Sequence, residues 1–200
     1  MIDDIFEIIF LAGLTLGSGI RARYGGGHRR KSKAVERKEG LTVWFLMSLW
    51  GCAQVAGIIY VLTHWLDFAD YRLPTWAGWV GAPVFAAALW LLWRSHADLG
   101  RNWSPTLEIS ENHALVTHGV YHRVRHPMYT AHLLWGVAQA LLLQNWIAGP
   151  LALAIFVPLY LLRVPREEQL MLDHFGEKYR LYTNRTGRLV PRLWSRSDGI

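Results

Sequence analysis

Cysteine, charge and the signatures of soluble enzymes are all scarce in this sequence of 200 residues. The single cysteine, Cys52, lies inside an apolar run, which excludes a disulfide framework and a paired-cysteine metal site. Neither G-x-S-x-G nor H-E-x-x-H occurs, and no G-x-G-x-x-G follows a predicted strand. The common hydrolase classes and a Rossmann nucleotide site are therefore excluded.

The shortage of charge points away from a soluble domain. Charged residues make up 18% of the chain, whereas soluble domains carry ~25%. Hydrophobic residues reach 52%, and the 11 tryptophans exceed the needs of a soluble core of this size. Tryptophan favours the membrane interface, where its ring is buried and its N–H stays hydrated. The composition predicts an integral membrane protein without a nucleic-acid partner, despite the net charge of +6.

Five apolar segments have nearly the ~20 residues that a helix needs to cross the hydrocarbon of a bilayer. They predict an all-α, multi-pass fold of about five transmembrane helices. The segments are Ile5 to Ile20, Leu41 to Trp65, Trp76 to Trp93, Met128 to Trp146, and Ile147 to Val164.

The basic residues are distributed asymmetrically between these segments. All of the 21 Lys and Arg residues except Arg72 lie in Arg21 to Gly40, Arg94 to Arg125, and Arg163 to Ile200. Because positive loops stay in the cytoplasm, the N-terminus is predicted outside and the C-terminus inside. Acidic residues precede the first segment, which argues against a cleavable signal peptide. The Arg21 to Gly40 stretch is expected to be a solvated loop against anionic headgroups.

The polar half of the chain is predicted to carry the chemistry. Residues 1–95 are expected to form lipid-side transmembrane helices, and residues 96–200 a half that binds a ligand from the cytoplasm. Pro165 followed by Glu167 and Glu168 predicts that a cytoplasmic helix begins near Arg166 and runs into the Tyr179 to Tyr182 region. The short connection Gln144 to Gly149 predicts a tight helical hairpin before it.

Two groups of side chains are candidates for a site. His118, His122 and His126 recur every four residues, but no Cys, Asp or Glu joins them locally, so a metal is disfavoured. Arg163 and Glu167 lie at the inner end of the fifth segment, where ionisable groups are costly unless they face a cavity or ligand. Alternatively, Arg163 extends to the headgroups and Glu167 pairs with it.

Two stretches together resemble a known family. "LVTHGVYHRVRHPMY" and "REEQLMLDHFGEKYRLYTNRTGRLVP" combine G-x-Y, R-H-P-x-Y, E-E and F-G-x-x-Y-x-x-Y. This half of the chain, residues 96–191, resembles the isoprenylcysteine carboxyl methyltransferases, within a wider group that includes small membrane phospholipid methyltransferases. The apolar segments before it resemble the family only in being apolar, so the lipid substrate follows less directly.

The resemblance implies S-adenosylmethionine as methyl donor and a prenylated cysteine, or a similar isoprenoid lipid, as carboxylate acceptor. It implies that Arg163 faces the lipid carboxylate and that Glu167 holds a cationic part of the cofactor, which makes these two residues the predicted catalytic pair. The other cofactor-binding positions that it implies are His113, Ala114, Leu115, Val116, Tyr121, His126, Pro127, Met128 and Tyr129. His118, His122 and His132 are expected to be packing or interface residues, and Leu99 to Pro105 either a lid or an interfacial turn.

Three alternatives remain open from the sequence. A phospholipid amine as acceptor needs a base near Arg163, and Glu168 is the candidate. A sterol reductase with a nicotinamide cofactor needs more basic residues for the cofactor phosphates. A membrane scaffold needs no ligand at all. The oligomeric state does not follow from the sequence.

Overall fold

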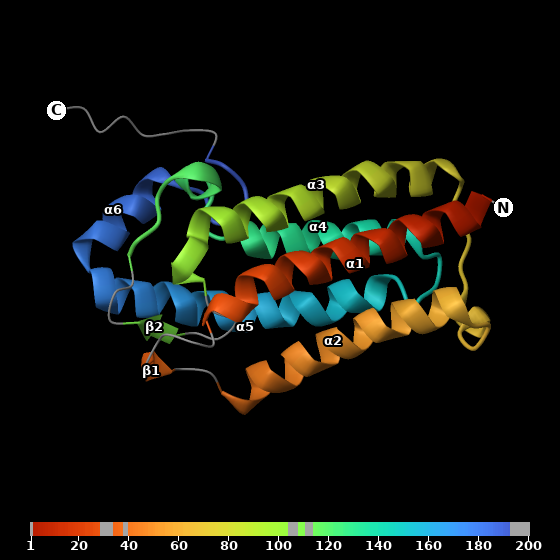
Figure 1. The fold of residues 1–200 in the computed structure, drawn as a ribbon, viewed down its shortest axis with the longest axis horizontal. Coiled ribbons are helices and arrows are strands. Elements are labelled where there is room, and N and C mark those ends of the chain that lie inside the picture. Colours follow the sequence, from red (N-terminus) through yellow and green to blue (C-terminus); the bar gives the residue numbers. More distant parts are fainter. Residues whose placement is uncertain (1, 29–33, 38–39, 104–107, 111–113, 193–200) are drawn as a thin grey trace.

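Five long helices lie alongside one another in the computed structural model, which describes residues 2–28, 34–37, 40–103, 108–110 and 114–192 (Figure 1). Their direction alternates along the chain, so consecutive helices run between the same two ends of the bundle. The helices are α1 (Ile2–His28), α2 (Leu41–Leu62), α3 (Trp76–Leu99), α4 (Pro127–Leu142) and α5 (Pro150–Phe175).

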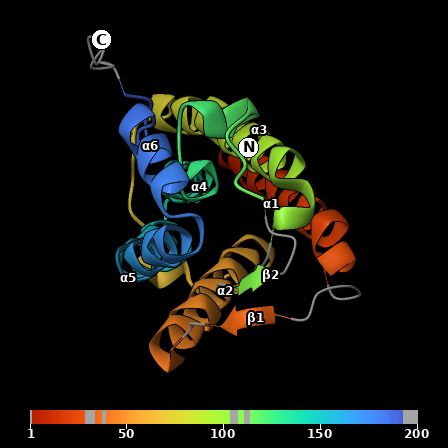
Figure 2. The ribbon, with the colours of Figure 1, turned by 90° about the vertical axis from the view of Figure 1, so that its left-hand side faces the viewer.

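Short elements gather mainly at one end of the bundle, on the left of Figure 1. They are the helix α6 (Glu177–Arg185), the 3₁₀ turns η2 (Gly100–Asn102) and η3 (Gly119–His122), and the strands β1 (Ala34–Arg37) and β2 (Glu108–Ser110). The two strands pair antiparallel, and Figure 2 shows them in front of the helices at this end. The 3₁₀ turn η1 (Asp67–Ala69) follows α2.

The predicted helical fold is confirmed, with the strand pair as an addition that the sequence did not predict. Strands of four and three residues are too short to show the alternation of apolar and polar residues that identifies a strand. The pair also changes the description of Arg21 to Gly40. Helix α1 continues to His28 and β1 follows, so Arg21 belongs to a helix and not to the solvated loop that was expected.

Helices α1, α3 and α4 pack tightly around aromatic side chains. Phe10, Phe85 and Trp135 are buried in one cluster, with the Phe85 and Trp135 rings edge-to-face at 4.8 Å. A Cβ at Gly13 would lie 2.1 Å from Phe85, and one at Gly17 would lie 2.5 Å from Trp135. Glycine at these two positions, one turn apart on α1, therefore allows the rings to pack against the helix backbone, as small residues do in membrane bundles.

Helix α2 packs mainly against α5. Val43 of α2 and Phe156 and Leu159 of α5 form a second, smaller cluster, and Figure 2 shows α2 beside α5 at the edge of the bundle. Large apolar residues such as Leu41 and Phe45 stay exposed on the outer face of α2. A helix with an exposed apolar face suits a lipid environment.

Among the residues that the structure describes, three helices are long and apolar enough to cross a membrane: Asp4–Gly25 of α1, Leu41–Leu62 and Trp76–Leu99. Together with the similarities reported below, they support an integral membrane protein. Helix α4 has 16 residues, which at ~1.5 Å per residue falls short of the ~30 Å hydrocarbon thickness. Helix α5 is longer, but its second half is charged. The fourth and fifth spans stay predictions.

The region around Pro165 corrects the sequence analysis. One helix, α5, runs from Pro150 through Pro165 to Phe175, where a new helix had been expected to begin near Arg166. A proline inside a helix removes one hydrogen bond, and burial of Val164 and Leu170 on both sides holds the helix together here. The break comes instead at Gly176, whose φ of 55° lies in the left-handed region and separates α5 from α6.

Candidate active site

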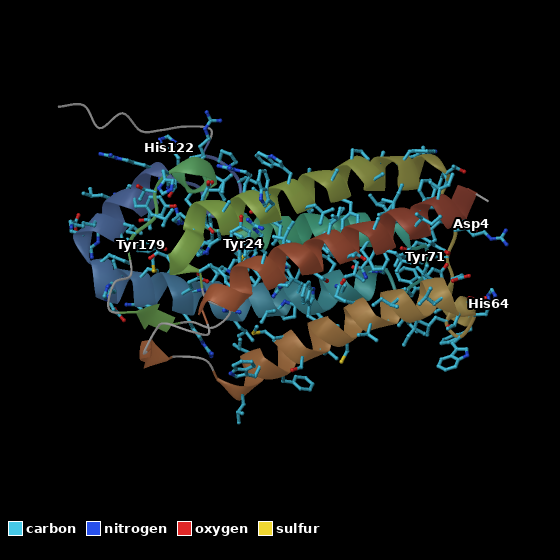
Figure 3. The ribbon with its side chains drawn as sticks, in the orientation of Figure 1. Asp4, Tyr24, His64, Tyr71, His122 and Tyr179 are labelled. Atoms are coloured by element: carbon cyan, nitrogen blue, oxygen red, sulfur yellow. The ribbon has the colours of Figure 1, made fainter. Side chains whose placement is uncertain are left out.

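A cavity of about 420 Å³ lies at the end of the bundle that carries α6. Tyr179 of its lining appears at this end in Figure 3, while Asp4, His64 and Tyr71 lie at the other. Nine predicted site residues line it: Ala114, Leu115, Val116, Tyr121, His126, Met128, Tyr129, Arg163 and Glu167. Pro127 is buried at the start of α4 but does not line the cavity. His113 lies outside the described residues.

The chain segment of residues 114–120 is held in place by side chains that accept hydrogen bonds from its backbone. Asn102 Oδ1 accepts a hydrogen bond from the Ala114 N–H at 2.9 Å. Gly119 has φ of 60°, a conformation that side chains disfavour. This turn brings the Val120 N–H to Asp98 Oδ2 at 2.9 Å. The cavity is also lined by Leu99, Asn102 and Trp103, so this part of the Leu99 to Pro105 segment forms a wall of the cavity. The segment's Ser104 and Pro105 lie outside the described residues.

Contacts from two other elements hold Tyr121 in place. Its hydroxyl donates to the Ser95 carbonyl at 3.4 Å, and the Tyr182 hydroxyl of α6 donates to the Tyr121 carbonyl at 2.7 Å. Burial raises the pKa of Tyr121 well above its usual value, so the phenol stays neutral. It can donate a hydrogen bond or stack on a ring, but it is not a base.

Glu168 is surrounded by cations outside the membrane-spanning part of α5. Its Oε1 lies 3.2 Å from Arg125 Nε and 3.2 Å from His126 Nε2, and both its oxygens accept from Arg188. Burial disfavours the charged form, but the hydrogen bonds from His126 and Arg188 outweigh it and lower the pKa of Glu168 to about 2. This carboxylate therefore holds the site together and is too weak a base to deprotonate an amine.

The chain after α6 returns to the start of α4; residues 186–192 are called the return segment below. The Arg125 N–H donates to the Gly187 carbonyl at 2.8 Å, and the His126 N–H donates to the Arg188 carbonyl at 3.0 Å. These bonds satisfy the backbone just before Pro127, which disfavours helix at the preceding residue. The return segment thus fixes where α4 begins and how His126 is presented.

Glu167, next to Glu168 in sequence, has a different environment. It lines the cavity, and its Oε2 accepts a hydrogen bond from the Tyr129 hydroxyl at 2.9 Å. His126 Nδ1 lies 3.8 Å from its other oxygen. The motif R-H-P-x-Y and the E-E pair, 38 residues apart, therefore meet in one hydrogen-bonded group. This end of the cavity presents negative charge.

Another part of the cavity lining, which begins one turn away from Glu167 on α5, is basic and aromatic, and sequence reasoning missed most of it. Arg21 of α1 lies over the Trp50 ring at 5.6 Å and 3.0 Å from His132 Nε2. Arg163 Nη1 contacts Met47 Sδ at 3.4 Å. All five residues line the cavity, including His132, which was expected to be a packing or interface residue. One signal was present in the sequence, since Gly13, Gly17 and Arg21 recur every four residues on one helix face.

His96 of α3 is a further cavity residue that the sequence did not indicate. It is buried, and its Nδ1 lies 2.8 Å from the Leu92 carbonyl, so Nδ1 carries the proton and Nε2 is an acceptor. Within the described part of the chain, Nε2 has no hydrogen-bond partner. A buried acceptor facing a cavity is costly unless a ligand donates to it. In the same part of the chain, no cluster of three His, Cys, Asp or Glu residues has metal-binding geometry.

The helices, their exposed apolar faces and the end cavity define an integral membrane protein that gathers acidic, basic and aromatic groups at one end of its bundle. Residues 79–173 match the model of the "Isoprenylcysteine carboxyl methyltransferase (ICMT) family". The match covers just under half of this chain and confirms the resemblance to the family that the two motifs indicated.

Several relatives are named protein-S-isoprenylcysteine O-methyltransferase, and they align with this chain over different lengths. Protein A of Arabidopsis thaliana is 26% identical over 141 residues, which cover 70% of this chain and 72% of that protein. Protein B of the same plant is 37% identical over 46% of this chain and 48% of its own length. The human protein is 29% identical over 66% of this chain and 50% of its own length. The chain thus spans about half the length of the latter two.

One solved structure is similar in fold. It is that of the eukaryotic intramembrane Ras methyltransferase ICMT, solved without a monobody, with a TM-score of 0.52 and 24% sequence identity. The match covers 74% of this chain and 50% of that one. The match shows that the two chains share a helical fold over this region.

Proposed function

We propose that this chain transfers a methyl group from S-adenosylmethionine to the carboxylate of a prenylated cysteine or a similar isoprenoid lipid. One observation carries the proposal. Glu167 and Arg163, four residues apart on α5, line a single cavity, and both residues lie in the segment that matches the methyltransferase family. A cation-binding group and an anion-binding group in one space suit a cationic donor and an anionic acceptor.

The residues present fit S-adenosylmethionine. The cofactor carries a sulfonium, an ammonium, a carboxylate and an adenine. Glu167, bonded to Tyr129, offers negative charge for a cationic part, and the unpartnered acceptor His96 Nε2 offers a place for a ligand N–H or O–H. Tyr121 and the segment Ala114 to Val116 offer stacking surface and backbone groups.

The residues of the chain act mainly by alignment. When bound, the cofactor supplies a sulfonium methyl group, which the acceptor carboxylate oxygen takes in line while the C–S electron pair stays on sulfur. The carboxylate is ionised at pH 7, so no base is needed. Arg163 orients it, ideally through two parallel hydrogen bonds. Such alignment is worth ~7–11 kcal/mol in favourable cases.

The phospholipid amine is the weaker acceptor class. An amine has to lose its proton before attack, and Glu168 was the candidate base. Its lowered pKa of about 2 and its bonds to Arg125, His126 and Arg188 make it a poor proton acceptor. A carboxylate acceptor avoids this requirement.

The membrane arrangement is part of the same proposal. The chain crosses five times, with the N-terminus outside and the cavity and C-terminus in the cytoplasm. The distribution of Lys and Arg supports this orientation, because Arg72 alone lies in a connection at the end opposite the cavity. Residues 1–95 contribute the lipid side, and residues 96–200 the methyltransferase half. Arg21, Met47 and Trp50 of the first part also line the cavity, so the two parts share it.

The test is methyl transfer in detergent from radiolabelled S-adenosylmethionine to N-acetyl-S-farnesylcysteine, beside phosphatidylethanolamine. Base-labile label on the farnesylcysteine supports the proposal, because an ester is hydrolysed by base and an N-methyl group is not. Label only on phosphatidylethanolamine would favour the amine acceptor. Stabilisation of the protein by NADPH but not by S-adenosylhomocysteine would favour a reductase, and stabilisation by neither a scaffold.

A further inference from the structure

We infer that Arg21 and Arg163 together form an anion-binding subsite at the inner side of the cavity, which holds the carboxylate of the lipid acceptor. The inference rests on the proposed function and adds to it a second cationic residue, from α1. Arg21 lies far from the family motifs in sequence, and residues 79–173 of the family match do not include it. It reaches the cavity because α1 packs closely on α3 and α4 through Gly13 and Gly17.

The immediate partner of Arg21 is electrically neutral. His132 Nδ1 lies 2.7 Å from the Met128 carbonyl, which only accepts hydrogen bonds, so Nδ1 carries a proton. Arg21 Nη1 lies 3.0 Å from His132 Nε2, and a guanidinium only donates, so Nε2 has none. His132 is therefore the neutral imidazole. It orients the guanidinium without cancelling its charge.

No carboxylate among the described residues lies within ion-pair distance of Arg21. The face of its guanidinium is covered by the Trp50 ring at 5.6 Å. His132 in turn is fixed between the Trp50 ring at 5.2 Å and the Phe156 ring at 5.3 Å. Arg21 is thus held in one orientation by neutral and aromatic groups while its charge faces the cavity. A partly buried cation held in this way is an anion-binding group without an internal counter-ion.

Arg21 and Arg163 border the same turn of α2. Arg21 lies over Trp50, and Arg163 contacts Met47, three residues earlier on the same helix face. Two guanidiniums facing one cavity repel each other, and an anion between them removes the repulsion. A carboxylate has two oxygens, so it can accept hydrogen bonds from both arginines at once.

Two carboxylates are available in the proposed reaction, those of the acceptor and of the cofactor. The surroundings of Arg21 favour the acceptor. Its neighbours are Trp50 of α2 and His132 of α4. Phe156, in the apolar part of α5, packs against both rings, and Trp50 and Phe156 provide a surface suited to a prenyl chain. Glu167, which suits the cationic part of the cofactor, is bonded to Tyr129 on the other side of Phe156 from this pair.

The experiment compares two ligands that differ only in charge. Dissociation constants of N-acetyl-S-farnesylcysteine and of its neutral carboxamide are measured in detergent for the wild type, Arg21→Gln and Arg23→Gln. Wild type should prefer the carboxylate by at least about tenfold, and Arg21→Gln should lose most of this preference. Arg23 lies on the exposed side of the same helix, so Arg23→Gln should keep the wild-type ratio. Preference retained in Arg21→Gln would overturn the inference.

A second variant keeps the test decisive if Arg21→Gln does not fold. Arg21→Lys keeps the charge but lacks the planar fork, so the preference should fall by about threefold. An unchanged ratio in Arg21→Lys, with no folded Arg21→Gln protein, would also overturn the inference. Thermal unfolding and size-exclusion chromatography establish folding for each variant.

The affinity for S-adenosylhomocysteine separates the remaining outcomes. It should be equal in wild type and Arg21→Gln, and a selective loss in the variant would assign Arg21 to the cofactor carboxylate instead. Methyl transfer to farnesylcysteine with no effect of Arg21→Gln on ligand preference would leave the proposed function standing and refute the subsite. Arg21-dependent binding of the carboxylate ligand without methyl transfer would support the subsite and refute the proposed function.

Discussion

The two sides of the cavity differ in charge and in how they are built. On one side, Glu167 accepts a hydrogen bond from Tyr129, and His126 lies 3.8 Å from its other oxygen, close to the return segment. On the other, Arg21 and Arg163 lie among Trp50, Met47 and His132. The acidic side comes from the sequence motifs, while the basic side comes largely from helices outside them.

This difference suits a reaction between a cation and an anion. If both signs were mixed throughout the lining, the protein's own groups would neutralise each other and bind neither ligand well. Separation lets each side bind one reactant, and their proximity brings the reactants together. Glu168 shows the contrasting case, because Arg125, His126 and Arg188 all pair with it and it serves structure instead of binding.

Glu168→Gln should have the largest effect on this arrangement. It leaves Arg125, His126 and Arg188 facing one another without their common carboxylate, and loss of one partner from a partly buried ionic cluster costs ~3 kcal/mol. Thermal unfolding in detergent should show the loss together with weaker S-adenosylhomocysteine binding. Glu177→Gln, at an exposed position of α6, is the matched control. Equal melting temperatures for the two variants would contradict the structural role of Glu168.

Acid should reproduce part of the same effect in the wild type. The folded-state pKa of Glu168, about 2, lies below the value of 4.5 for an unperturbed glutamate. Its contribution to stability is therefore fully present above pH ~4.5 and is lost as the pH falls toward ~2. Unfolding measured across this range should lose stability more steeply in wild type than in Glu168→Gln. Parallel curves would show that the carboxylate contributes nothing.

Arg163→Lys should lower turnover on a carboxylate lipid by an order of magnitude or more, which is ~1.4 kcal/mol of barrier per tenfold. Lysine keeps the charge but cannot form two parallel hydrogen bonds. Affinity for S-adenosylmethionine should change little. Arg166→Lys, exposed three residues later on α5, should be silent. Full activity of Arg163→Lys would return Arg163 to the role of a membrane-interface anchor and favour the amine acceptor.

Glu167→Gln should show the opposite pattern, with cofactor binding weakened first. Amide and carboxylate have nearly the same shape, so the change removes the negative charge and leaves the packing intact. A several-fold loss of S-adenosylmethionine affinity, ~1 kcal/mol, is expected for an interaction that is partly exposed to solvent. Titration calorimetry in the detergent used for turnover measures it. Weakened lipid binding with unaltered cofactor affinity would contradict the assignment of Glu167 to the cofactor and assign it to the lipid instead.

Tyr129→Phe should have the smallest effect. It removes the hydroxyl that donates to Glu167 and leaves the ring in place, which costs cofactor affinity ~0.5–1 kcal/mol. Tyr71→Phe removes a hydroxyl that donates to the Ala140 carbonyl at the far end of the bundle, so it should not alter cofactor affinity. If both variants bind S-adenosylhomocysteine like wild type, Tyr129 does not position Glu167.

The acidic side could be predicted from the sequence because its residues belong to short motifs. Tyr121, Tyr129 and Glu167 were implied by the resemblance that these motifs carry, and all three line the cavity. Arg21 was assigned to a loop because its contact with His132 joins residues 111 apart, which no local pattern reveals. Helix α5 was divided at Pro165 because proline is a local signal, whereas the burial that carries the helix through it is a tertiary effect.

The return segment has a consequence for the order of events during biosynthesis. His126 and Arg125 are held by the backbone of Gly187 and Arg188, and Glu168 by the side chain of Arg188. These groups are synthesised after every helix of the bundle. The helices can enter the membrane one after another while translation continues, but the site cannot close until residues 187 and 188 have left the ribosome. A nascent chain stopped at the end of α6 would therefore be inserted yet unable to bind its ligands tightly, so tight ligand binding would mark synthesis of the return segment.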